Sequence, residues 1–147
     1  MPAATPLAMI PGREDRAMSL IRDFWTAMNG NEWAAVAEHF LTDDFVGIWP
    51  QTGEIFRGRE AFVAANASLA GQHGWLFEVM RVVTEGDHAA SDVRVMQRDL
   101  HMIARAASFH DIRDGKICKQ VEFWSYPNSI PEWRRGVLES DPNLAKF

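Results

Sequence analysis

Four side chains in the second half of the chain are of the types that perform acid/base chemistry: Asp92, Arg94, His110 and Glu122. A carboxylate beside a guanidinium stays ionised, whereas a carboxyl group in apolar surroundings has a raised pKa and carries a proton. Asp92 and Glu122 on either side of Arg94 therefore favour an acid and a base with a charge-setting partner. His110 adds a group that orients a substrate or shuttles a proton. A surface ion pair and a histidine without catalytic role are the open alternatives.

Metal and thiol chemistry are not expected. The histidines considered as ligands lie in different segments without metal-ligand spacing, so we expect no metal and no cofactor; they are His73, His88, His101 and His110. The lone Cys118 has no disulfide partner and no activating neighbour, and we expect a small buried hydrophobe.

The candidate residues lie in a stretch of β-like sequence from Trp75 to Tyr126, with turns predicted at 85–87, 99–101 and 114–115. This pattern predicts a four-stranded antiparallel meander. Because side chains alternate across a strand, Asp92, Arg94 and Met96 share one face and Val93 and Val95 the other.

The turn at 113–115 decides how the last two strands match. A two-residue turn places His110 opposite Lys119, whereas a type I turn with Gly115 as a bulge places His110 opposite Cys118. We favour the bulge because it gathers the polar residues on one face: Asp92, Arg94, Ser108, His110, Gln120, Glu122 and Trp124. The opposite, apolar face predicts a homodimer interface formed by Val93, Val95, Phe109, Val121 and Phe123.

The preceding sequence predicts the elements that must support this sheet. Helical spacing indicates helices at 13–28, 32–40 (capped by Asn31) and 59–72, with strands at 45–49 and 54–57 and a short last helix from 131. The order predicts an α+β domain whose helices cover one face of a curved sheet.

Composition limits the remaining possibilities. The 147 residues, 47% of them hydrophobic, suit a single domain, expected at 13–140 between an N-terminal arm (1–12) and a tail (141–147). A net charge of −5 without a basic run argues against nucleic acid as a partner. No apolar stretch approaches the ~20 residues of a membrane span and no secretion signal is evident, so we expect a cytoplasmic protein.

Several segments together resemble the nuclear transport factor 2-like superfamily, and within it the SnoaL-like group: 28–33, 40–44, 53–60, 114–117 and 122–124. The resemblance implies a cone-shaped curved antiparallel sheet wrapped around three N-terminal helices, an α+β barrel with a deep pocket that is often dimeric. The superfamily contains ketosteroid isomerase, limonene epoxide hydrolase, scytalone dehydratase, polyketide cyclases and noncatalytic binding domains. The fold alone therefore leaves the function open.

Matching residues narrows the chemistry that the resemblance implies. Phe24, Trp49 and Ser108 fall where ketosteroid isomerase has its oxyanion-hole tyrosine, its base and its oxyanion-hole acid, which excludes that mechanism. Glu122 corresponds to the catalytic aspartate of limonene epoxide hydrolase, and Asp92-x-Arg94 to its Arg-x-Asp pair in reverse order. The groups that hold water in that enzyme are replaced by Val46 and Ile48, and no base of the SnoaL-like cyclases can be matched.

The resulting expectation is a pocket for a small, largely apolar molecule, walled by Phe24, Trp49, Met96, Gln120 and Trp124. Any chemistry would be proton transfer without a cofactor: isomerisation, dehydration, cyclisation or epoxide opening, carried by Asp92, Arg94, His110 and Glu122. The alternatives are a noncatalytic ligand-binding domain and an oligomerisation module. Trp25, Trp49, Trp75 and Trp124 are otherwise expected as core residues.

Overall fold

The computed structural model describes residues 12–70, 74–98 and 103–147. The N-terminal half contains α1 (Arg13–Met28), α2 (Trp33–Phe40), β1 (Leu41–Trp49), β2 (Glu54–Arg57) and α3 (Gly58–Ala70). The meander that follows consists of β3 (Trp75–Glu85), β4 (His88–Gln97), β5 (Ile103–Arg113) and β6 (Lys116–Ser125). Two short 3₁₀ helices, η1 (Glu132–Arg134) and η2 (Pro142–Ala145), complete the chain, so a 3₁₀ turn replaces the last helix expected from 131.

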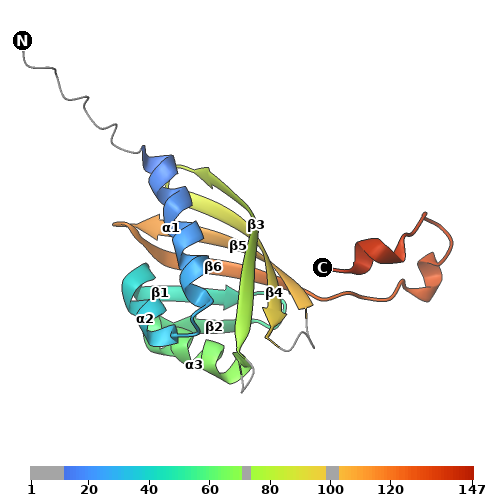
Figure 1. Ribbon diagram of the computed structural model, residues 1–147, viewed down its shortest axis with the longest axis horizontal. Helices are drawn as coiled ribbons and strands as arrows, with labels where there is room; N and C mark the ends of the chain where they lie inside the picture. Colours follow the sequence, from blue (N-terminus) through green and yellow to red (C-terminus); the bar gives the residue numbers. More distant parts are fainter. Residues whose placement is uncertain (1–11, 71–73, 99–102) are drawn as a thin grey trace, which may run out of the picture.

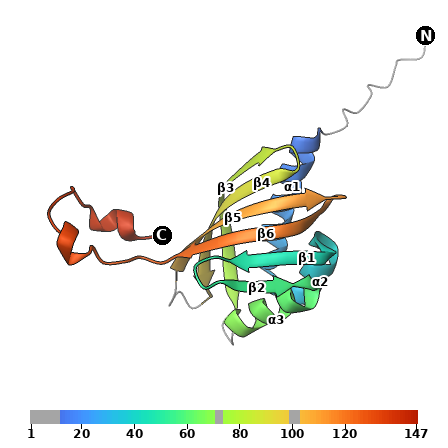
Figure 2. The ribbon, with the colours of Figure 1, turned by 180° about the vertical axis from the view of Figure 1, so that it is seen from behind.

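The six strands form one curved sheet in the order β2-β1-β6-β5-β4-β3, with the helices on one of its faces (Figures 1 and 2). The α+β fold is confirmed, with two differences from the expected sheet. It is mixed, because β1 runs parallel to β6, and it remains open, with β2 and β3 as its edges in the described part of the chain. The C-terminal segment extends away from the sheet beyond the end of β6 (Figure 1).

Helix α1 has the predicted bounds and lies across the inner face of the sheet (Figure 1). Its buried residues Ile21, Phe24, Trp25 and Met28 recur three and four positions apart, which places them on one stripe of the helix. The Phe24 and Trp25 rings pack edge to face, with centroids 5.0 Å apart. The inner face of the sheet packs against this stripe of α1.

The turn between α1 and α2 is fastened to the free edge of β3. The Asn31 amide oxygen accepts from the backbone N–H of Trp75 at 2.7 Å and its amide nitrogen donates to the Trp75 carbonyl at 2.9 Å. Asn29 makes the same pair of bonds with Phe77, at 2.7 and 3.1 Å. The prediction of Asn31 as a helix cap is therefore wrong: α2 begins at Trp33 without a side-chain cap, and Asn31 adopts a left-handed conformation with φ of 55°.

The hairpin between β5 and β6 differs from the favoured prediction but gathers the same face. Asp114 and Gly115 have φ of 53° and 74° and form a two-residue turn of the type that Asp-Gly favours. The bulge lies in β6 instead, where Cys118 is passed over between Ile117 and Lys119. His110 consequently pairs with Gln120 rather than with Cys118, and Ser108 pairs with Glu122. Cys118 is half-buried.

The predicted faces of β4 are reversed relative to β5. Ser91, not Asp92, pairs with Ser108, and Val93 and Val95 are fully buried on the inner face. Asp92, Arg94 and Met96 therefore lie on the outer face of the sheet. The expected turn at 99–101, which connects these strands, lies largely outside the described residues. The prediction failed because it matched polar residues to polar residues, whereas the inner face takes the apolar valines.

Candidate functional site

Glu122 is the acidic group at the centre of the inner face. Its side chain is only 5% exposed. Oε2 accepts hydrogen bonds from the Ser108 hydroxyl at 2.8 Å and from the Gln120 amide at 2.9 Å. The Trp49 and Trp124 side chains also act on the carboxyl group and lower its pKa. Oε2 is therefore held by neighbouring side chains of β5 and β6.

Burial raises the pKa of Glu122, because removal from water disfavours the carboxylate. The polar side chains around it, Ser108, Trp124, Trp49 and Gln120, act in the opposite direction but do not outweigh burial. With two donors on Oε2, the proton of the neutral acid belongs on Oε1. Glu122 is thus a proton donor aimed away from its own network.

A small cavity of about 20 Å³ adjoins Glu122, enough for one water molecule. Its walls include Phe24, Gln120 and Trp124. The buried indole N–H of Trp124 makes no hydrogen bond with any described residue, although it lies near enough to Glu122 to lower the pKa of the carboxyl group. The Glu122 carboxyl group and the Trp124 indole N–H thus border the same small space.

Beyond this inner cavity lies an outer chamber of about 400 Å³, a size suited to a small ligand. It is lined by Trp49, Gln51, Thr52, Glu54, Trp75, Trp124 and Tyr126. Trp49 and Trp124 line both spaces and so stand between the chamber and Glu122. Their rings pack nearly perpendicular to each other, with centroids 6.3 Å apart.

His110 lies behind the cavity and not in its lining. Its Nε2 is 2.8 Å from the Ser91 hydroxyl, which also accepts from the Trp25 indole N–H at 3.0 Å. Because that hydroxyl already accepts one bond, its own proton is free to donate to Nε2, which leaves a buried Nδ1 without a partner among the described residues. Burial lowers the pKa of His110 to about 3, with a small opposing effect of Asp111. His110 is therefore a neutral, structural neighbour of the site.

The charged residues of β4 are the main correction to the predicted site. Asp92 forms a bidentate ion pair with Arg105, in which Nε and Nη2 donate to Oδ1 and Oδ2 at 2.5 and 2.8 Å. The Arg105 guanidinium holds the pKa of Asp92 below the usual range. Arg94 pairs with Glu78 at 2.8 Å. Both pairs are partly exposed on the outer face, so neither Asp92 nor Arg94 shares a wall with Glu122. Met96 is displaced for the same reason.

Four of the five predicted ligand-binding residues do line the two spaces: Phe24, Trp49, Gln120 and Trp124. Trp75 is buried in the core, as expected, and also lines the chamber. The sequence analysis missed Gln51 and Thr52 in the β1–β2 turn and Glu54 at the start of β2. That turn reaches the chamber because β1 pairs in parallel with β6, and no local pattern reveals this pairing. The sequence offered one indication of an aromatic chamber at this place: Trp124 near the end of β6 and Tyr126 directly after it.

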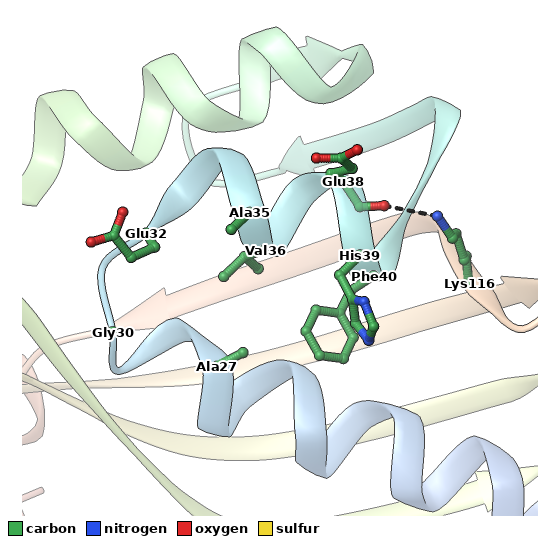
Figure 3. A pocket seen from close by; sticks show the side chains of 9 residues that line it. All are labelled: Ala27, Gly30, Glu32, Ala35, Val36, Glu38, His39, Phe40 and Lys116. Carbon is green, nitrogen blue, oxygen red and sulfur yellow. Dashed lines mark hydrogen bonds between the residues drawn. The ribbon is translucent and has the colours of Figure 1, made fainter.

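A second, larger hollow lies between the end of α1 and α2 (Figure 3). Its acidic residues Glu32 and Glu38 lie at opposite ends of α2, and the Lys116 ammonium donates to the Glu38 backbone carbonyl at 2.8 Å. These polar groups do not converge on one point. The hollow is therefore a less suitable candidate than the space beside Glu122.

The described residues contain no group of three or more side chains placed to hold a metal ion. None of the described helices combines the length and the apolar character needed to cross a bilayer. The candidate site is thus defined by one buried carboxyl group, its donors and an aromatic chamber.

Comparison with known proteins gives a family and a fold. The family model described as SnoaL-like domain matches residues 21–120. A candidate ketosteroid isomerase from Kribbella flavida is 24% identical over 88% of this chain and 92% of its own, with a TM-score of 0.73. An NTF-2 like protein of unknown function from Burkholderia xenovorans is 23% identical over 88% and 98%, with a TM-score of 0.69.

An LEH-like epoxide hydrolase from M. tuberculosis is 15% identical over 78% of this chain and 86% of its own, with a TM-score of 0.65. At these identities the solved structures establish the fold alone. No curated protein matches the chain.

Proposed function

The chain belongs to the family of SnoaL-like domains, and on this basis we propose that it is a cofactor-free acid/base enzyme acting on a small, largely apolar substrate. One observation carries the proposal: a buried carboxyl group with a raised pKa borders a small cavity that shares the Trp49 and Trp124 walls of an aromatic chamber. Burial favours the protonated form of such an acid and moves its pKa toward the neutral range, where a general acid is most effective.

Glu122 donates this proton to a substrate oxygen placed in the inner cavity. Ser108 and Gln120 hold Oε2, so the acid presents Oε1 without turning. The Trp124 indole N–H donates a second hydrogen bond to the same substrate oxygen and stabilises negative charge that develops there. In a dehydration, the hydroxyl group leaves as water with the proton of Glu122, and the resulting carboxylate removes a proton from the neighbouring carbon, which forms the double bond and restores the acid. In an epoxide opening, Glu122 protonates the oxygen as the C–O bond breaks, and a water molecule adds to the carbon and returns its proton to the carboxylate.

The role expected for Asp92 as the second member of an acid/base pair is not retained, because it lies on the other face of the sheet. The chemistry is therefore proposed for a single carboxyl group that gives and takes one proton. Glu54 is the one other acid among the described lining residues, and it is exposed.

A noncatalytic ligand-binding domain is the second candidate, and the volume of the inner cavity favours it. A space of about 20 Å³ admits a water molecule but not a substrate, so Trp49 or Trp124 must move before any larger group reaches Glu122. If these side chains stay in place, the chamber binds a ligand and the acid takes no part.

Solvent exchange distinguishes the two candidates. The protein is incubated in D₂O with a panel of small cyclic enones, allylic alcohols and epoxides, and deuterium incorporation and new products are followed by mass spectrometry. We expect turnover of at least one class, a loss of about 100-fold or more in Glu122→Gln, and unchanged turnover in Asp92→Asn on the outer face. Binding of panel members without turnover in the wild type would favour the noncatalytic domain.

A further inference from the structure

The outer chamber has a marked charge preference in addition to its aromatic walls. Among the described residues that line it, Glu54 is the one charged side chain, and no lysine or arginine is present. Glu54 is exposed and forms no ion pair with any described residue. An anionic ligand would thus meet a carboxylate without a compensating cation, whereas a cationic ligand would provide the missing partner.

The aromatic rings of the chamber are arranged at steep angles to one another. Trp124 packs against Trp49 at 80° and against Trp75 at 63°, each with centroids 6.3 Å apart. Tyr126 adds a fourth ring to the lining. Three indoles in different planes offer electron-rich faces in several directions, which is the arrangement that attracts ammonium groups carrying alkyl substituents.

Solvation favours the same class of ligand. A quaternary ammonium group or protonated tertiary amine carries its charge beneath methyl or methylene groups, so it loses less hydration on entering an apolar chamber than a primary ammonium does. The net charge of −5 of the chain adds a long-range attraction for cations. The charge of the lining, the arrangement of the rings and the cost of desolvation therefore all favour a cationic ligand with apolar substituents.

We propose that the outer chamber binds a cationic group with apolar substituents, a quaternary ammonium or a protonated tertiary amine, held by Trp49, Trp75 and Trp124 with Glu54 as counter-charge. This inference rests on the proposed function, because it places the cationic part of the substrate in the chamber and leaves the inner cavity for the reacting oxygen. It narrows the expected small, largely apolar molecule to one with a positive charge.

A cation in the chamber also acts on the acid behind it. Trp49 and Trp124 line both spaces, and a positive charge on the chamber side favours the ionised form of Glu122. Binding of the cation therefore lowers the pKa of Glu122 and releases protons at pH values between its pKa in the free and bound protein. A neutral ligand of the same shape has no such effect.

The test compares choline with 3,3-dimethyl-1-butanol, which has the same shape but carbon in place of the charged nitrogen. Calorimetry and tryptophan fluorescence measure both affinities on the wild-type protein, in two buffers of different ionisation enthalpy so that proton release is counted. We expect choline to bind at least about tenfold more tightly, the gain that two ring contacts provide. Equal affinities, tighter binding of the alcohol, or no saturable binding of choline would overturn the inference.

Variants locate the binding. Glu54→Gln is expected to weaken choline several-fold and leave the alcohol unchanged, while Glu14→Gln, an exposed carboxylate in the first turn of α1, changes neither. An equal effect of both variants would show nonspecific attraction and contradict the proposal. Deuterium exchange that depends on Glu122 but no preference for choline would retain the proposed function and reject this inference; the reverse outcome would reject the function and keep the cation site.

Discussion

Glu122 and His110 lie on the same inner face, and burial favours the neutral form of both by shifting their pKa values in opposite directions. The pKa of the carboxyl group is raised and that of the imidazole is lowered, because in each case the charged form loses its hydration. The consequences for stability therefore have opposite signs. Glu122 destabilises the folded state as the pH rises above the ordinary glutamate range, whereas His110 destabilises it as the pH falls.

The first prediction concerns acid unfolding. The unfolded chain takes up a proton on His110 below about pH 6.5, whereas the folded chain resists it until about pH 3. At about 1.4 kcal/mol for each pKa unit, the free energy of unfolding falls by several kcal/mol between these values. Urea unfolding from pH 7 to pH 4 should show this loss in the wild type and a smaller one in His110→Phe. Identical slopes in both proteins would contradict the burial of His110.

The second prediction concerns the outer ion pairs. Arg94 and Glu78 are exposed by 32% and 51%, so water screens their interaction. Arg94→Met should change the free energy of unfolding by no more than about 1 kcal/mol, with the same value at pH 5 and pH 8. A loss of about 3–5 kcal/mol at pH 8 alone would instead place Arg94 among buried carboxylates, as the sequence first suggested.

At the level of elements, local patterns predicted the helices and turns well. Helical spacing gave α1 its observed bounds, and the Asp-Gly and Glu-Gly-Asp turns ended strands where the structure ends them. The pairing of strands that are distant in the sequence was harder to predict. The relative faces of β4 and β5 depend on a connection that carries no clear turn signal, and the parallel pairing of β1 with β6 leaves no local trace.

The sequence predicted those site residues that share one strand, because alternation along the strand places them on the same face. It did not predict the site residues whose position depends on how two strands pair. Glu122, Gln120 and Trp124 alternate on one strand, so their common face followed from the sequence. The alternation of β4 was also correct, but matching its polar residues to those of β5 assigned Asp92 and Arg94 to the inner face. The buried pair Val93 and Val95 shows that apolar burial was the better guide.

The third prediction tests the fastening of the β3 edge, which also fixes Trp75 in the chamber wall. Asn29→Ala removes two hydrogen bonds to the Phe77 backbone without disturbing backbone angles, since Asn29 has φ of −64°. We expect a loss of about 1–3 kcal/mol and faster hydrogen exchange at the Phe77 amide. Asn66→Ala, which removes a bond to a carbonyl within α3, serves as the control and should cost less.

At the scale of the whole molecule, the outer face of the sheet is apolar along one continuous row. The row consists of residues paired across neighbouring strands from β3 to β2: Val83, Ala90, Phe109, Val121, Ile48 and Ile55. Phe109 is 54% exposed and packs against Phe123, which is 45% exposed. Val93 and Val95, expected in this surface, belong to the core instead.

The fourth prediction is that two copies of the chain contact each other through this row. Exposed apolar patches commonly mark interfaces, and a two-fold dimer uses the same patch on both copies. Sedimentation of the full chain at micromolar concentration should show a dimer. Phe109→Asp should shift it to a monomer, while Arg94→Met, on the same face beside the row, should leave it dimeric. A monomeric wild type would contradict the proposal.

The central claim is that burial beside the inner cavity raises the pKa of Glu122 above the ordinary glutamate range. Its most direct test is an NMR titration of protein labelled with ¹³C at the glutamate carboxyl carbons, with the Glu122 resonance assigned by its loss in Glu122→Gln. We predict that Glu122 titrates above the ordinary glutamate range and that saturation with choline lowers its midpoint. A midpoint for Glu122 within the ordinary glutamate range would contradict the account.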